Sequence, residues 1–407
     1  VRVPGGGRGE ASETLIMQGH LDMVGEKNSN TVHDFARDPI RLRRDGDWLC
    51  ASGTTLGADN GIGVSLLLAA GEGHFAHHPP LELLFTVDEE TGMSGAKELD
   101  VTYLSGRRLL NLDAEEEGVL YVGCAGGVDR VVSLPFRRES ARPGEVTVSL
   151  YVDGLRGGHS GLDIIKNRGN AIRLLVRALM RLPRAGIDFR LAELEGGSKR
   201  NAIPREARAK LRIRAELARR IPQVLPGFLA ELKELHGDSE GDWQIGFDVH
   251  TDEAPATIPD VEARRALAFL HTVPDGVISL SQTVPGLVET SSNLGVVSTA
   301  DERFLITICS RSANPAALEL IGDRLAAHAH LAGMISRSEA GYPAWKPDMS
   351  SQMLAVSRRV FSDLAGGAEP EVTAIHAGLE CGLFRERMPQ VDMISFGPDI
   401  ENAHSPD

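Results

Sequence analysis

Short apolar segments alternate with polar turns in the first part of the chain. Residues 14–18 (TLIMQ), 81–87 (LELLFTV) and 108–112 (RLLNL) each have the length and composition of a buried strand. The apolar run that follows Gly61 predicts a helix to about Ala70. Short strands that alternate with a helix predict an α/β fold with a mixed, mostly parallel sheet.

The pattern changes after the glycine-rich segment GCAGG. Residues 145–152 alternate between apolar and polar positions as a strand does, and residues 167–182 predict a helix. Arg173, Arg177 and Arg181 are spaced four apart and fall on one side of this helix, opposite its apolar residues. We expect this side to be a solvated face.

A second domain is inserted between two parts of the first. Residues 196–214 and 289–311 form a faint repeat, because each runs from a turn with an asparagine into a strand with an arginine. We interpret residues 131–336 as an inserted α+β domain of hairpins and helices. Residues 1–130 and 337–407 would then form one catalytic domain.

Charge and cysteine content exclude several classes of protein. The formal net charge is -14 with both signs interspersed, so the chain lacks the basic face that nucleic-acid binding requires. The cysteines are far apart without a Cys-x-x-Cys pair, which indicates reduced thiols. No window approaches the roughly 18 apolar residues of a membrane span, and no signal peptide is visible. We therefore expect a cytoplasmic protein without membrane or nucleic-acid partners.

Candidate metal ligands follow the predicted strands. His20 comes directly after the first strand, Glu89 and Glu90 come after the second, and Asp113 comes after the third. The carboxyl ends of strands form the edge of an open α/β sheet where ligands bind. These side chains are therefore expected to meet at one edge.

Asp59 can bridge two metal ions. It is the acid at the start of the predicted helix, in the segment GADNGIG. Two divalent cations about 3.5–4 Å apart need a shared carboxylate. The other ligands then form two pairs, His20 with Asp113 and Glu90 with His404. Mixed imidazole and carboxylate ligation suits zinc and is compatible with manganese or cobalt.

Asp22 and Glu89 complete the predicted site. Asp22 is two residues from His20, so it can accept the second ring N–H of that histidine and orient it. Glu89 should point away from Glu90, because adjacent side chains on an extended backbone point apart. It is then available as the general base that takes a proton from a metal-bridging water.

Each of these residues also has an ordinary alternative role. An acid at a helix start often caps the helix, and a Glu-Glu pair usually lies on a solvated surface. The segment DAEEEG could be a surface turn, and His404 could belong to a frayed tail. The ordered occurrence of all of them after strand ends favours the metal site.

The motifs resemble a known family. GHLDMV, TTLGADNGIG, EETG, DAEEEG, GCAGG, GGHSG, RNAIPREA, HAGLECGLF and HSPD are similar to the bacterial aminoacyl-histidine dipeptidases. These enzymes are also called cytosol non-specific dipeptidases or peptidase D. They belong to the di-zinc superfamily that includes carnosinases, aminoacylases and glutamate carboxypeptidases. The resemblance covers almost the whole chain.

The resemblance implies a zinc-exopeptidase fold with two divalent metal ions per subunit and an inserted lid domain that forms a homodimer. It implies His20, Asp59, Glu90, Asp113 and His404 as metal ligands, with Glu89 as the base and Asp22 as the orienting acid. It also implies that His159 in GGHSG stabilises the oxyanion, often from the partner subunit. Arg311 would hold the substrate's C-terminal carboxylate, and Asn201 and Gly378 would contact the substrate.

We therefore predict a metal-dependent dipeptidase that hydrolyses unblocked dipeptides broadly, including Xaa-His. A second hypothesis is an amidase of the same superfamily that acts on N-acyl amino acids. The intact segments GLECGLF and GGHSG favour the dipeptidase. A third hypothesis is a metal-binding protein without catalysis, and the presence of Glu89 argues against it.

Overall fold

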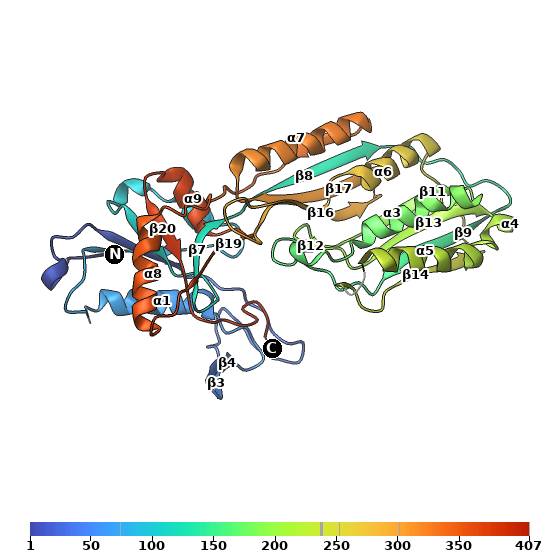
Figure 1. Cartoon of the computed structure of the whole chain (residues 1–407). Coiled ribbons are helices and arrows are strands. Elements are labelled where there is room, and N and C mark those ends of the chain that lie inside the picture. Colours follow the sequence, from blue (N-terminus) through green and yellow to red (C-terminus); the bar gives the residue numbers. More distant parts are fainter. Residues whose placement is uncertain (74, 237–238, 252, 301, 407) are drawn as a thin grey trace. The chain divides into compact units, whose positions relative to one another are not determined.

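The computed structural model describes residues 1–73, 75–236, 239–251, 253–300 and 302–406. The chain forms two compact units (Figure 1): unit 1 is Val1–Ala125 with Pro343–Asp407, and unit 2 is Gly126–Tyr342. The boundaries expected at 130/131 and 336/337 fall inside β8 (Gly126–Pro135) and β18 (Ile335–Ser338). Both strands belong to unit 2 over their whole length because they pair with each other.

Unit 1 is built on a seven-stranded mixed sheet with the order β1-β5-β2-β6-β20-β7-β19. Strands β5, β2, β6 and β20 run parallel, as do β7 and β19, whereas β1 and β5 and also β20 and β7 are antiparallel. The predicted mixed, mostly parallel sheet is confirmed. The strands are β1 (Arg2–Val3), β2 (Leu15–His20), β5 (Leu81–Thr86), β6 (Arg108–Asn111), β7 (Val119–Cys124), β19 (Glu371–Ile375) and β20 (Asp392–Ser395).

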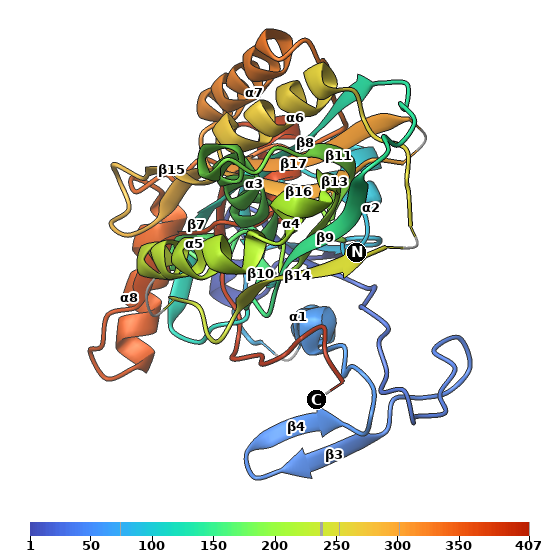
Figure 2. The same cartoon turned by 90° about the vertical axis from the view of Figure 1, so that its right-hand side faces the viewer.

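Helices cover both faces of this sheet. Ile16 of β2 packs with α2 and α9, whereas its neighbours Leu15 and Met17 pack on the side of α1 and α8. Burial on both faces explains why the strands are continuous apolar runs. The hairpin β3–β4 extends from unit 1 outside this sheet (Figure 2). The bounds are β3 (Leu42–Asp45), β4 (Trp48–Ala51), α1 (Ala58–Gly71), α2 (Ser94–Glu98), α8 (Gln352–Leu364) and α9 (Glu380–Arg387), with 3₁₀ turns at Gly7–Gly9 and Val101–Tyr103.

Unit 2 contains a nine-stranded antiparallel sheet. Its order is β14-β9-β13-β11-β16-β17-β8-β18, and β15 pairs with β16. A short ladder of β10 with β12 lies outside this sheet. The strands are β9 (Glu145–Asp153), β10 (Gly158–His159), β11 (Arg190–Gly196), β12 (Ala202–Ile203), β13 (Ala207–Arg214), β14 (Gln244–His250), β15 (Gly276–Leu280), β16 (Val288–Ser298) and β17 (Arg303–Ser312).

Helices pack on the sheet of unit 2 and enclose its main apolar core. Helix α3 is capped by Asn170, whose side chain accepts hydrogen bonds from the first-turn amides of the helix. Helices α6 and α7 lie side by side (Figures 1 and 2), and α7 packs on β8 and β17. The helices are α3 (Ala171–Arg181), α4 (Ala215–Ala218), α5 (Ile221–His236), α6 (Asp260–Thr272) and α7 (Pro315–Leu331), with 3₁₀ turns at Ile164–Lys166 and Pro183–Ala185.

Two sequence-based interpretations of unit 2 need correction. The arginine side of α3 is only partly solvated: its three arginines are half-buried, and Arg173 donates hydrogen bonds to the backbone carbonyls of Leu270 and Val273. Helix α3 lies between α5 and α6, so long side chains on this side reach neighbouring elements. Asn293 lies within β16 instead of in a turn, and its amide donates to the backbone carbonyls at Arg200 and Ala202.

Candidate metal centre

Three parallel strands of unit 1 carry candidate ligands to one edge of the sheet. His20 is the last residue of β2, and Asp113 follows the end of β6 by two residues. The register between β2 and β6 brings these two side chains together. On the other side of β2, β5 leads into Glu89 and Glu90.

Two glycines allow α1 to approach β2 closely. A Cβ atom at Gly19 or at Gly63 would collide with the side-chain oxygen of Asn60. The amide nitrogen of Asn60 donates a hydrogen bond to the backbone carbonyl of Leu112, at 2.5 Å. The start of α1 is thereby attached to the end of β6, which positions Asp59 beside the strand ends.

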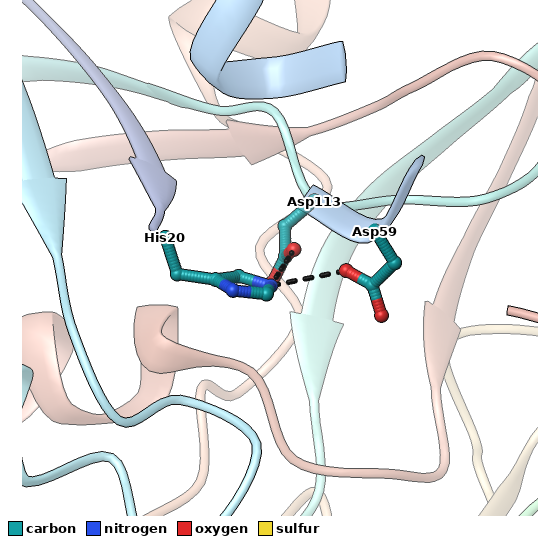
Figure 3. Close-up of side chains that lie close together, drawn as sticks. All are labelled: His20, Asp59 and Asp113. Atoms are coloured by element: carbon teal, nitrogen blue, oxygen red, sulfur yellow. Dashed lines mark hydrogen bonds and ion pairs between the residues drawn. The ribbon is translucent and has the colours of Figure 1, made fainter. Parts of the chain in front are cut away.

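The two carboxylate oxygens of Asp59 face different pairs of side chains. Oδ1 lies 3.0 Å from His20 Nε2, which is also 3.1 Å from Asp113 Oδ1 (Figure 3). Oδ2 lies 3.3 Å from His404 Nε2, which is 3.2 Å from Glu90 Oε2. Each set could hold a metal ion, and Asp59 is common to both.

The tautomer of His20 fits a cation at this position. Its Nδ1 lies 2.9 Å from the backbone carbonyl of Asp22. A carbonyl can only accept a hydrogen bond, so Nδ1 carries the proton. Nε2 is then the ring nitrogen that faces Asp59 and Asp113. It is the atom that can bind a cation held by these two carboxylates.

Buried carboxylate oxygens also indicate a cation at this cluster. Within the described parts of the chain, Glu90 Oε1 and Asp113 Oδ1 are buried without a hydrogen-bond partner. Asp113 Oδ1 comes only to ion-pair distance from His20. Burying such an oxygen unpaired is costly, and carboxylates with imidazoles are an ordinary donor set for divalent cations. The residues present therefore fit divalent metal ions.

The pKa values of these side chains reflect strong mutual interaction. Burial lowers the pKa of His20, but the adjacent carboxylates of Asp113 and Asp59 outweigh it and raise this pKa to about 12. Hydrogen bonds to two carboxylates raise the pKa of His404 to about 10. Burial, together with the charge of Asp113, raises the pKa of Glu89 to about 9. The cluster thus attracts positive charge strongly.

Asp22 contacts the cluster through different atoms from those expected. The sequence predicted that its carboxylate would accept the second ring N–H of His20, but the backbone carbonyl accepts it instead. Carboxylate Oδ1 lies 3.6 Å from that nitrogen, and Oδ2 accepts a hydrogen bond from the backbone N–H of Glu90 at 3.1 Å. The side chain therefore links the segments that carry His20 and Glu90.

Glu89 and Glu90 lie in a turn. Asp88, directly before them, has a φ of 60°, so the chain bends where it leaves β5. The expectation that the two side chains point apart on an extended backbone is wrong. Ligand atoms of Glu89, Glu90 and His20 all lie within 4.8 Å of one another.

Residues 16–407 match the family model described as Peptidase family M20/M25/M40. The chain belongs to this peptidase family. The cytosol non-specific dipeptidase of Escherichia coli (strain K12) is 40% identical over 412 residues, which cover 100% of this chain and 83% of that protein. The crystal structure of aminoacylhistidine dipeptidase from Vibrio alginolyticus is also 40% identical, with a TM-score of 0.88, and the match covers 100% of this chain and 82% of that one.

A more distant structure shares the fold alone. Aminopeptidase PepT from Bacillus cereus is 13% identical, with a TM-score of 0.50 over 100% of this chain and 77% of that chain. The predicted resemblance to the aminoacyl-histidine dipeptidases is confirmed by the closer relatives. Peptidase family M20/M25/M40 is metal-dependent, and the ligand groups of unit 1 agree with this. In the described part of the chain, no helix is long and apolar enough to span a membrane.

In this member of the M20/M25/M40 family, His159 and Arg311 contact each other within unit 2. Arg311 Nη2 lies 3.4 Å from His159 Nε2, and the backbone N–H of Leu162 donates to His159 Nδ1 at 3.2 Å. Since Nδ1 accepts, Nε2 carries the proton, and two N–H groups face each other. Arg311 is buried, and no described carboxylate lies within 4.0 Å of its guanidinium.

The remaining two predicted residues lie in different units. Asn201 precedes β12 in unit 2, and its backbone carbonyl accepts a hydrogen bond from the N–H of Ser160 at 2.9 Å. It therefore supports the segment that carries His159. Gly378 lies in unit 1, between β19 and α9.

Sequence reasoning missed a buried carboxylate next to the ligand-bearing strands. Glu380 Oε2 accepts hydrogen bonds from Gln18 Nε2 at 2.5 Å and from Thr86 Oγ1 at 2.6 Å. These two residues lie on β2 and β5, and Glu380 is fully buried. An acid inside the otherwise apolar segment GLECGLF was the signal that could have revealed it.

Proposed function

We propose that this chain is a metal-dependent dipeptidase that hydrolyses unblocked dipeptides with broad specificity, including Xaa-His dipeptides. The observation that carries the proposal is the position of Asp59, whose two oxygens face two separate imidazole–carboxylate pairs. The substrate class is supported by the names of two relatives at 40% identity, a cytosol non-specific dipeptidase and an aminoacylhistidine dipeptidase.

Two divalent ions, zinc or alternatively manganese or cobalt, would be held by unit 1. His20 and Asp113 would bind the first, His404 and Glu90 the second, and Asp59 both. When bound, the ions polarise the peptide carbonyl and lower the pKa of water. The backbone carbonyl of Asp22 keeps the proton of His20 on Nδ1, which leaves Nε2 as the ligand atom.

Glu89 is the proposed general base. Its carboxylate belongs to the same cluster as His20 and Glu90, where it can take a proton from the attacking water and pass it to the leaving amine. Asp22 supports the neighbouring turn through its hydrogen bond to the N–H of Glu90.

Unit 2 supplies the proposed substrate-binding residues. Arg311 would bind the C-terminal carboxylate, and His159 would donate a hydrogen bond to the oxyanion. The proximity of these two side chains, whose facing nitrogens lie 3.4 Å apart, supports a common ligand. Asn201 and Gly378 would contact the substrate as well. Unit 2 would serve as a lid and as the interface of a homodimer, and the name of the 40% identical cytosol dipeptidase supports a cytoplasmic location.

A substrate panel with controlled metal content tests the function. We expect the metal-loaded protein to hydrolyse free dipeptides and to leave N-acetylated ones and N-acyl amino acids nearly untouched. Chelation should abolish the activity and added zinc should restore it. Preference for N-acyl substrates would establish the alternative amidase, and no turnover of either class by metal-loaded protein would indicate metal binding without catalysis.

Substitution of the shared carboxylate tests the site itself. Asp59→Ala should weaken the binding of both ions, because its carboxylate offsets the charge of each. Metal content after dialysis should fall from two ions per chain toward none. Full occupancy in this variant would exclude the bridging role.

A further inference from the structure

Arg311, Gly127 and Tyr342 form a row across three neighbouring backbone segments of unit 2. Arg311 of β17 is paired directly with Gly127 of β8, and Gly127 is paired on its other side with Tyr342. The backbones of Gly127 and Tyr342 exchange two hydrogen bonds of 3.0 Å. Directly opposed residues of antiparallel strands project from the same face. Arg311 and Tyr342 therefore share a face, on either side of a residue that has no side chain.

Because Gly127 has no side chain, the side chains of Arg311 and Tyr342 can meet. A Cβ atom at this position would lie 2.6 Å from both Cζ and the hydroxyl oxygen of Tyr342, so the aromatic ring occupies that space. From there, the hydroxyl oxygen accepts a hydrogen bond from Arg311 Nη1 at 2.5 Å. A larger residue at position 127 would displace the ring and break this contact.

The contact determines how the guanidinium is oriented. Tyr342 holds Nη1, and Nη2 faces His159. A guanidinium binds a carboxylate through two parallel N–H groups, so recognition depends on the orientation of its plane. A long side chain that is already held in place loses less conformational freedom when the ligand arrives.

We propose that Tyr342 is a positioning residue that acts through Arg311 on the carboxylate of the substrate, and that Gly127 is required to admit its ring. The inference rests on the proposed function, because it takes Arg311 as the group that binds the C-terminal carboxylate. It assigns a role to Tyr342 and to the last glycine of GCAGG.

The first test compares a dipeptide with its C-terminal amide as substrates of the metal-loaded enzyme. Tyr342→Phe keeps the ring and removes only the hydroxyl group. We expect KM for the dipeptide to rise about 3- to 10-fold, which corresponds to the cost of ordering one side chain. The value of kcat should change less than about twofold, and kcat/KM for the amide should be unchanged. An equal loss for both substrates, or no change in KM, would overturn the proposal.

Tyr151→Phe is a matched control in the same sheet. Its ring also lies over a cross-strand glycine, Gly246, and beside an arginine, Arg208, whose guanidinium stacks on the ring. The substitution also removes only a tyrosine hydroxyl group, at a position remote in sequence from Arg311. It should leave KM and kcat at their wild-type values.

A double-mutant cycle tests the role of Gly127. Gly127→Ala should raise KM for the dipeptide at least as much as Tyr342→Phe, because the ring is displaced. In a Tyr342→Ala background the space is empty, so adding Gly127→Ala should have almost no further effect. Additive effects would show that the two positions act independently and would overturn the role proposed for Gly127. Circular dichroism and metal content identify variants that fail to fold, and Tyr342→Phe alone still decides the proposal.

Arg311→Ala separates this inference from the proposed function. It should raise KM for the dipeptide by about 100-fold or more and abolish the preference for the acid over the amide. If it does so while Tyr342→Phe has no effect, only the positioning role is refuted. If Arg311→Ala leaves the preference intact, the assigned role of Arg311 is wrong and the positioning role falls with it.

Discussion

The side-chain amide of Asn60 donates a hydrogen bond to the backbone carbonyl of Leu112, 2.5 Å away. Asn60 follows the shared carboxylate Asp59, and Leu112 precedes Asp113. One buried hydrogen bond thus connects two segments whose carboxylates face the same nitrogen of His20. This connection holds Asp59 close to Asp113, in the candidate ligand group that the two carboxylates form with His20.

Asn60→Ala is expected to weaken metal binding about 10- to 100-fold, because supporting contacts of ligand segments typically contribute this much. The measurement is metal retention against a series of chelator concentrations. Asn30→Ala, in an exposed loop of unit 1, is the control and should retain both ions. Unchanged affinity in a folded Asn60→Ala protein would show that the hydrogen bond does not position the ligands.

Glu89 and Glu90 should respond differently to the same substitution. Glu89→Gln removes the proposed base, so turnover should fall about 10²–10⁴-fold while metal content stays near two per chain. Glu90→Gln removes a ligand of the second group, so one ion should be lost. Metal analysis together with kcat distinguishes them. Loss of an ion from Glu89→Gln with none from Glu90→Gln would mean that the two roles are exchanged.

His159 and Arg311 lie in contact within one unit, so they should serve the same substrate. If unit 2 acts across a homodimer, mixing inactive His159→Ala with inactive Glu89→Gln should restore activity. One site of the heterodimer would then combine an intact base with an intact lid.

The matched mixture of His159→Ala with Arg311→Ala, assayed at a substrate concentration near the wild-type KM, should show no more activity than the two variants alone in either arrangement, because every lid carries a defect. Activity is measured after subunit exchange has been verified. Recovery in this second mixture would show that the two residues serve different sites. Failure of the first mixture would place the lid over its own subunit's site.

The buried carboxylate of Glu380 should make the stability of the metal-free protein depend on pH. Burial raises its pKa from 4.5 to about 7. The unfolded chain therefore loses this proton at lower pH than the folded chain does, and the free energy of unfolding falls as pH rises from about 4.5 to about 7. A shift of this size corresponds to about 3 kcal/mol.

Glu380→Gln removes this titration and keeps an oxygen that can accept from Gln18 and Thr86. Urea unfolding of both proteins at several pH values gives the difference in unfolding free energy. The difference should be near zero below pH 4.5 and should favour the glutamine variant by about 3 kcal/mol at pH 8. A difference in unfolding free energy that does not vary with pH would contradict the raised pKa of Glu380.

Much of unit 1 could be predicted because its information is local. The strands β2, β5 and β6 are short apolar runs, and each ends at a histidine or two residues before an acid. Regular helix geometry starts after Asn60, as predicted from the apolar run that follows Gly61. Parallel strands must present their carboxyl ends at a common edge, so the sequence predicts that His20 and Asp113 lie at the same edge, and the pairing of β2 with β6 brings them together.

Details that depend on backbone direction could not be predicted in this way. The turn that begins at Asp88 brings Glu89 and Glu90 to the same cluster, and the backbone carbonyl of Asp22 replaces its carboxylate at His20. Both results depend on where a loop bends after it leaves the sheet. Residue type and spacing do not specify that bend.

The sequence by itself indicated which residue types form the candidate metal centre, because most of the candidate ligands lie close to the end of a strand or the start of a helix. Only the tertiary structure decided that Gly127 lies between Arg311 and Tyr342. That row depends on the register among strands far apart in the chain, and a shift of one residue would turn these side chains to the opposite face. Register is set by the packing of the whole sheet, so no local pattern in the sequence contains it.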